Sequence, residues 1–390
     1  MVFGAVLIRS PMLKEWIRMG AKVASVNIRH VSREARVGVA TVSRVINGST
    51  EVSPQTRKHV EAVIRRLGYR PNAHARRILR HAEMVCFMVS NRPFFHPFHA
   101  GILQGAEAYA SDLKRHVMFV QNNCEKETPP DQIILPPILE EKGWVNGVIL
   151  TGAVYPNLIS RIEALNLPLV VFGNNVFDMS NKGSFDRVCY DGIRAEFEAT
   201  EYLINRGHRL IAFIGDTEYP WLREQYQGYI RAMRASKLNP LSVTRKRPGT
   251  FAEYAEWAAV RLLGSKRVPT AMLAGDDEIA YGLYRSLRRL GVKIPGDISL
   301  IGFDDRELAA LLDPPLTTVR VDSQEIGRCC IKLLFEGLHK ASKSVSTHLV
   351  PTKLIERESV QWYVPPQAKI KRPTVKLLTT EGRHDAQQQA

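Results

Sequence analysis

Seven short apolar runs, separated by stretches with a helical pattern, dominate the chain from about residue 85 onward. The runs cover residues 85–89, 117–120, 147–150, 169–172, 210–214, 271–274 and 298–301. Helical patterns such as 195–205 and 279–290 lie between them. This alternation is typical of buried parallel strands joined by helices. It therefore predicts open α/β sheets with a ligand crevice at the carboxyl ends of the strands.

Residues 25–80 have a different composition from the rest of the chain. They contain twelve Lys and Arg residues against three Glu residues, and they lack β-rich apolar runs. The segment reads as three or four short helices. The whole chain of 390 residues carries a formal net charge of +15. This basic excess favours a polyanionic partner, although a solvated basic surface gives the same composition.

Within this basic segment, residues 28–47 read as two short helices around a tight turn. A third helix begins with Ser53 as the N-cap and Pro54 in the first turn, and it ends at Gly68. Apolar residues at helical spacing form the predicted inner faces. They are Val31, Ala35, Val42, Val45, Ile46, Val60, Val63, Ile64 and Leu67.

The outer face of the second helix carries the residues suited to reading DNA. In a helix-turn-helix, the second helix enters the major groove with its N-terminal residues against base edges. Arg44 can bind guanine or a phosphate, and Val39 and Ala40 can contact thymine methyl groups. Thr41, Ser43 and Asn47 complete the predicted contact set. A three-helix bundle with a solvated basic face fits the same composition, so composition alone leaves both interpretations open.

The residues of this segment closely resemble the headpiece of the lactose/galactose repressor family. The matching stretches are 39–47 (VATVSRVIN), 52–57 (VSPQTR) and 67–72 (LGYRPN). The Val-Ala pair that opens the second helix resembles the galactose repressor branch most. Two residues depart from the family pattern, since Arg36 replaces a turn glycine and Gly38 replaces a serine N-cap. Arg36 is strained if the turn requires a positive φ, whereas a glycine N-cap costs little.

The resemblance implies that residues 72–79 form a hinge that becomes helical on DNA. Two such hinges from a dimer would enter the minor groove, with Ile78 as the apolar wedge where the family usually has leucine. Arg76 and Arg77 would lie along phosphates, and Asn72 opens the segment. A plain basic linker is the alternative interpretation.

The resemblance continues to about residue 360. Matching stretches include 145–150, 207–209, 268–271, 296–305 and 314–319. It implies an all-α helix-turn-helix headpiece followed by a two-lobed, periplasmic-binding-protein-like α/β domain. We expect a disordered extension at 1–24, the headpiece at 25–70, the hinge at 71–82, the effector-binding and dimerisation domain at 83–362, and a disordered tail at 363–390.

Five residues correspond to effector-binding positions of the family. They are Phe98, Gln225, Phe251, Asp276 and Asp304. Gln225 stands three residues before a glycine, where the family has an arginine that binds ligand hydroxyls or a carboxylate. Alternatively, the two phenylalanines are ordinary core residues and the two aspartates cap helices.

Gln225 also affects the expected charge of the pocket. A glutamine cannot form a charge-assisted, bidentate bond to an anion. Asp276 and Asp304 would then leave the pocket floor acidic, unless Arg223 reaches in. Tyr219, Trp221 and Tyr226 could stack on a ring. The sequence therefore favours a neutral or cationic effector with a ring face, or a pocket that has lost its ligand.

Together these features predict a sequence-specific transcription regulator, a repressor rather than an enzyme. We expect a cytoplasmic homodimer that binds a palindromic double-stranded DNA operator and a small-molecule effector, a sugar or related ring compound, with no cofactor and no metal. The five cysteines show no metal-ligand spacing, and no apolar run approaches a membrane span. Nucleophile-elbow, phosphate-loop and HExxH motifs are absent. A regulator with a degenerate pocket and a sugar-binding protein that does not act on DNA are the alternatives.

Overall fold

The computed structural model describes residues 27–364 apart from 47–48, 50, 68, 70–83, 94, 142, 179–184, 245–248 and 340–344. The chain divides into two compact units, Met1–Ala82 and Glu83–Ala390. Several predictions fall outside the described residues. They concern Asn47, Gly68, the two terminal segments up to residue 24 and from residue 365, and the hinge with Asn72, Arg76, Arg77 and Ile78.

The first unit contains the three predicted helices of the headpiece. These are α2 (Ile28–Ala35), α3 (Val39–Ile46) and α4 (Pro54–Leu67). Ser53 caps α4, since its hydroxyl accepts a hydrogen bond from the Thr56 N–H at 3.2 Å. The buried core confirms the predicted inner faces of the helices. It consists of Val31, Ala35, Val42, Val45, Val60, Val63 and Tyr69, with Ile46, Ile64 and Leu67 packed against it.

The second unit contains two six-stranded sheets. The first, which we call the N-lobe sheet, has the order β11-β5-β4-β3-β1-β2, and all its pairings are parallel. Its strands are β1 (Met84–Ser90), β2 (His116–Asn122), β3 (Val148–Gly152), β4 (Leu169–Phe172), β5 (Asp186–Cys189) and β11 (Thr347–Leu349). The helices of this lobe are α6 (Pro97–Asp112), α7 (Pro137–Glu140), α8 (Pro156–Glu163) and α13 (Ser323–His339).

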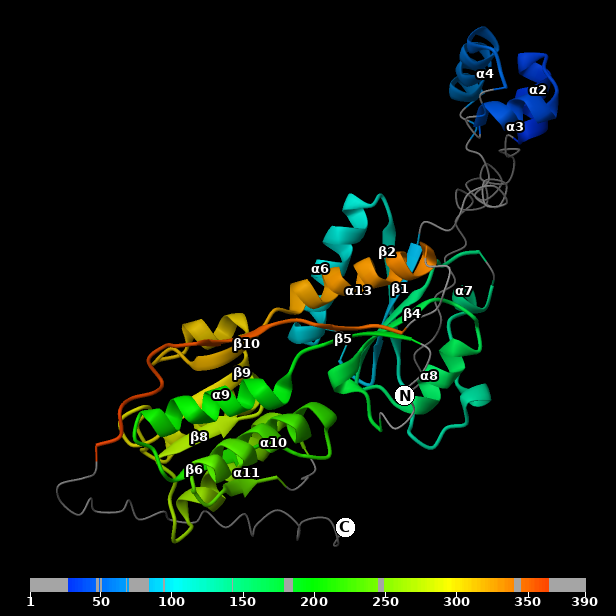
Figure 1. Ribbon diagram of the computed structural model, residues 1–390. Helices are drawn as coiled ribbons and strands as arrows, with labels where there is room; N and C mark the ends of the chain where they lie inside the picture. The colour runs from blue at the N-terminus through cyan, green and yellow to red at the C-terminus, as the bar shows by residue number, and fades with distance from the viewer. Residues whose placement is uncertain are drawn as a thin grey trace, which may run out of the picture. The chain divides into compact units, whose positions relative to one another are not determined.

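Helices α6 and α13 lie side by side although more than 200 residues separate them (Figure 1). Glycines make this close packing possible. A Cβ atom on Gly105 of α6 would lie 1.9 Å from the Gln324 carbonyl oxygen, and one on Gly327 of α13 would lie 1.9 Å from the Ile102 carbonyl oxygen. Any side chain at either position would therefore push the two helices apart.

The second sheet, the C-lobe sheet, has the order β12-β10-β9-β8-β6-β7. Only β12 is antiparallel to its neighbour. The strands are β6 (Ile211–Ile214), β7 (Leu241–Val243), β8 (Ala271–Ala274), β9 (Ser299–Asp304), β10 (Thr317–Val321) and β12 (Thr352–Ile355). The covering helices are α9 (Gly192–Asn205), α10 (Pro220–Ala235), α11 (Phe251–Leu263) and α12 (Asp277–Arg289).

The chain passes between the two lobes three times. It leaves the N-lobe sheet after β5, returns after β10 through α13, and crosses again between β11 and β12 (Figure 1). The loops at the carboxyl ends of β1, β4, β6, β8 and β9 supply the residues of the site described below. Among the described residues, no helix is both long and apolar enough to span a bilayer.

Candidate functional site

Helix α3 of the headpiece presents the predicted DNA-contact residues on its outer side. Val39, Ala40 and Arg44 are exposed, whereas Thr41 and Ser43 are half-buried. The Arg44 guanidinium lies 3.4 Å from the Glu51 carboxylate, and both side chains are more than half exposed. Such an exposed pair contributes little to stability. Arg44 can therefore exchange Glu51 for a base or a phosphate at small cost.

The turn before α3 adopts the conformation that makes an arginine unfavourable. Arg36 has φ 52° and ψ 39°, in the left-handed region that favours glycine. Ser32 stabilises the turn, since its hydroxyl donates to the Val37 carbonyl oxygen at 2.6 Å. A Cβ atom built on Gly38 would meet no atom of the described residues closer than the Thr41 Oγ1, which lies 3.9 Å away. A serine N-cap would therefore fit at this position.

The second unit has a cleft between its two lobes. The space inside, measured out to the open mouth, is about 340 Å³. The N-lobe supplies five lining residues, which are Arg92, His96, Phe98, His99 and Asn175. The crossover after β5 supplies Tyr190. The C-lobe supplies Trp221, Asp276, Asp304 and Arg306.

Arg92 follows β1 and extends to aromatic rings of the C-lobe. Its guanidinium lies 4.7 Å from the ring centre of Trp221, 5.5 Å from that of Tyr219 and 5.8 Å from that of Phe251. Burial lowers the pKa of Arg92, but an arginine remains charged in proteins. Arg92 is thus a half-buried cation with a buried Nε, held against rings by cation–π contacts.

Two histidines at the start of α6 also face the cleft. His96 is the N-cap of α6 and makes no side-chain capping bond, and His99 is buried one turn later. Burial lowers the pKa of His96 to about 3, and the charges of Arg306 and Arg92 act in the same direction. Burial and the proximity of His96 lower the pKa of His99 as well. Both imidazoles are therefore neutral at physiological pH.

Asp304 lies at the carboxyl end of β9 and carries an ion pair. The Arg306 guanidinium donates to one Asp304 oxygen from Nη2 at 2.9 Å and from Nε at 3.1 Å. Burial raises the pKa of Asp304 to about 6, against the opposing effect of Arg306. Asp304 has φ 112° and Asp305 has φ 56°, both unfavourable for side-chain-bearing residues. Strain of this kind persists only where the surroundings fix it.

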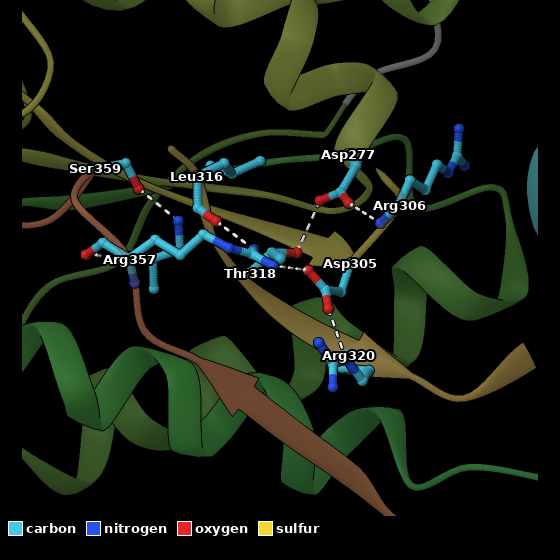
Figure 2. Close-up of polar contacts among 9 residues, drawn as sticks. Asp277, Asp305, Arg306, Leu316, Thr318, Arg320, Arg357 and Ser359 are labelled. Carbon is cyan, nitrogen blue, oxygen red and sulfur yellow. Dashed lines mark hydrogen bonds and ion pairs between the residues drawn. The ribbon is translucent and has the colours of Figure 1, made fainter. Parts of the chain in front are cut away.

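A network of polar contacts behind the cleft holds this strained strand end in place (Figure 2). The Asp305 carboxylate accepts hydrogen bonds from Arg357 at 2.7 Å and from Arg320 at 2.6 Å. The buried Asp277 carboxylate accepts hydrogen bonds from the backbone N–H of Arg306 and from the Thr318 hydroxyl, both at 2.8 Å. The network therefore fixes the backbone from which Asp304 and Arg306 reach into the cleft.

The five residues proposed for the effector site have different surroundings. Phe98, Asp276 and Asp304 line the cleft. Asp276 also caps α12, because its Oδ1 accepts from the Ile279 N–H at 2.8 Å. Phe251 is not among the lining residues; it packs against the C-lobe core and Tyr219. Gln225 is fully buried and is not among the lining residues, and neither polar atom of its amide makes a well-formed hydrogen bond to the described residues.

The predicted acidic floor of the pocket is wrong. Arg92 and Arg306 lie in the cleft together with Asp276 and Asp304, so the two cations balance the two carboxylates. Arg223 does not supply the positive charge, because its guanidinium donates to carbonyl oxygens of its own segment. The argument from Gln225 for a neutral or cationic effector therefore loses its basis.

Sequence reasoning missed most of the polar residues of the cleft. The missed set comprises Arg92, His96, His99, Asn175, Tyr190 and Arg306, whereas Trp221 was considered as a stacking residue. A positional rule could have found Arg92 and Arg306, since each lies two residues after a predicted or observed strand end. In parallel α/β sheets, ligands bind outside those ends.

Two family models match the chain in its two units. The model described as "Bacterial regulatory proteins, lacI family" matches residues 27–72. The model described as "Periplasmic binding protein-like domain" matches residues 200–360.

Curated relatives align over nearly their whole length. The HTH-type transcriptional repressor CytR of Escherichia coli K12 is 30% identical over 338 residues, which are 86% of this chain and 96% of CytR. The chain belongs to the lacI family of bacterial regulatory proteins. It is a transcriptional regulator with a DNA-binding headpiece and an effector-binding domain. Catabolite control protein A of Priestia megaterium is 31% identical over 341 residues, 86% of this chain and all of that protein.

Solved structures of lacI-family proteins share the fold. The Lac repressor dimer bound to operator and an anti-inducer matches with a TM-score of 0.72 over 86% of this chain and 99% of the repressor chain, at 24% identity. The transcriptional regulator CelR in complex with cellobiose matches with a TM-score of 0.61 over 86% of this chain and 99% of its own, at 27% identity. The predicted family, fold class and general function are thus confirmed.

Proposed function

We propose that this lacI-family regulator represses transcription by binding a palindromic DNA operator as a homodimer, under the control of a small molecule bound in the cleft. The observation that carries the proposal is the exposed outer side of α3, where Val39 and Ala40 open the helix and Arg44 lies in its last turn. CytR is described as a transcriptional repressor and CelR as a transcriptional regulator, and the Lac repressor structure is a dimer on its operator.

The first experiment tests base reading by Arg44. Fluorescence anisotropy compares the affinity of the wild type and of Arg44→Ala for a selected palindromic duplex and for its scrambled version. Losing a base contact should weaken specific binding by roughly 1–3 kcal/mol, which is about fivefold to 150-fold. Lys58→Ala is the matched control, because it also removes one exposed charge, but from α4. Equal wild-type affinity for the specific and scrambled duplexes at physiological salt would contradict the proposal.

The homodimer follows from the expected palindrome, since a two-fold pair of headpieces matches two half-sites. The sequence after residue 365 has no apolar heptads that would support a coiled-coil tetramer. Light scattering at micromolar concentration should therefore give the mass of two chains. A stable tetramer, or a monomer that binds a full operator tightly, would refute this assembly.

The hinge proposal rests on the sequence alone. We propose that Ile78 enters a central base step in the minor groove and that Arg76 and Arg77 follow the phosphates. Ile78→Ala should reduce both the bend angle of the DNA and the affinity. The inserted side chain offsets the cost of unstacking two base pairs, because the bent DNA contacts more of the protein surface. An unchanged angle in a gel-based bending assay would assign the wedge to another residue.

A further inference from the structure

The polar residues of the cleft include donors that lack a partner among the described residues and two aspartate carboxylates. We propose that the effector is a polyol that carries one anionic group, a carboxylate or a phosphate. The anionic group would bind between Arg92 and the first turn of α6. This inference rests on the proposed function, since it names the ligand class of the same cleft.

Arg92 is the cation that lacks an anionic partner. Arg306 pairs with Asp304 at 2.9 Å, but no carboxylate of the described residues forms an ion pair with Arg92. Its Nε is buried and makes no hydrogen bond to those residues. One face of the guanidinium lies over Trp221, which leaves its N–H edge for a ligand. An arginine edge suits bidentate binding of a carboxylate or phosphate, and an unpaired buried charge is costly.

The start of α6 adds further donors to the cleft. No side chain of the described residues caps this helix of 16 residues, and its first turn contains no acidic residue. Its free N–H groups and dipole favour an anion. The Nδ1 atoms of His96 and His99 are buried and have no hydrogen-bond partner among the residues that the structure describes, and His99 is only 2% exposed. As neutral imidazoles, both can donate one hydrogen bond without adding charge.

The C-lobe side of the cleft supplies acceptors for hydroxyl groups. Asp276 and Asp304 are acceptors of the C-lobe, and each has acceptor capacity beyond the bonds to Ile279 and Arg306. A negatively charged group of the ligand would be repelled if it lay beside these carboxylates. The ligand must therefore carry its negative charge toward Arg92 and its hydroxyls toward the aspartates.

The apolar surfaces of the cleft limit the rest of the ligand. Phe98 and Trp221 supply the apolar surfaces. They can pack against the C–H face of a pyranose or of an extended sugar acid.

The test is calorimetric titration of the full-length protein with four matched probes. D-Glucuronate and D-gluconate carry a carboxylate, D-glucose 6-phosphate carries a phosphate, and D-glucose is the neutral parent. A thermal-shift panel of aldonic acids, uronic acids, monosaccharide phosphates and their neutral parents extends the comparison to other stereoisomers. We expect at least one anionic member to bind at least about tenfold more tightly than its neutral parent.

Two variants locate the anion. Arg92→Gln should weaken binding of the anionic ligand at least about tenfold and leave its neutral parent nearly unchanged. Arg223→Gln is the matched control, because it removes one charge from an exposed arginine bound to its own backbone. Tighter binding of a neutral parent, no binding by any anionic member, or full affinity in Arg92→Gln would overturn the inference. Operator binding measured without ligand tests the proposed function separately. A failure of the effector inference can therefore be distinguished from a failure of the proposed function.

Discussion

Asp305→Asn tests how much of the domain's stability depends on the polar network behind the cleft. Asparagine keeps the shape of the side chain and tolerates the φ of 56° at this position. The substitution removes the negative charge opposite Arg357, whose side chain is 17% exposed against 4% for Asp305. Removing one partner of a buried pair costs about 3–5 kcal/mol. Because the Arg357 guanidinium keeps its bond to the Leu316 carbonyl oxygen, we expect a loss of about 3 kcal/mol.

Urea denaturation, followed by tryptophan emission, measures the free energy of unfolding of this variant. Arg320→Gln is the control, since it breaks the other contact of Asp305 through a side chain that is 52% exposed. An exposed pair of this kind contributes at most about 1 kcal/mol. A loss below about 1 kcal/mol in Asp305→Asn, or an equal loss in both variants, would refute the argument that burial makes the Arg357 contact dominant.

Two further predictions concern the headpiece turn and the titration of the cleft. Arg36→Gly should stabilise the headpiece by about 1 kcal/mol, because glycine adopts the left-handed conformation without strain; no increase in the urea midpoint would contradict this. Asp304, whose pKa burial raises to about 6, should be ionised above that pH. The affinity for the cleft ligand should therefore rise as the pH rises through 6, and Asp304→Asn should flatten the profile. The pKa of Asp304 in the folded protein lies above that of an aspartate in the unfolded chain. The contribution of Asp304 to the free energy of unfolding is therefore present at low pH and is lost as the pH rises through 6. An unchanged pH profile in Asp304→Asn would assign the titration to another group.

The sequence predicted the elements that are apolar and periodic. All seven apolar runs from residue 85 overlap strands of the two sheets, and β4 and β8 have the predicted bounds. The strands β5, β7, β10, β11 and β12 were missed because polar residues interrupt them or because most of their side chains are half-buried or exposed, as in Asp186–Cys189. Their strand conformation depends on the neighbouring strand rather than on their own apolar pattern.

The site was harder to predict because its properties arise from contacts between distant segments. Arg92 acquires its role from Trp221 and Asp276, which lie more than a hundred residues away in the other lobe. Phe251 had the residue type of a stacking ring, but it packs against the C-lobe core beside Tyr219. Residue types at family positions therefore suggested which loops form the site, but they did not give its charge.

The measurement that tests the central claim most directly is operator affinity with and without a ligand bound in the cleft. Fluorescence anisotropy on the selected palindrome would use the anionic sugar derivative that calorimetry shows to bind, with the wild type and with Arg92→Gln. The account predicts that the ligand changes the operator Kd of the wild type by at least about fivefold. The same concentration should leave the Kd of Arg92→Gln nearly unchanged. An operator Kd that stays the same while the cleft of the wild type is saturated would contradict the claim.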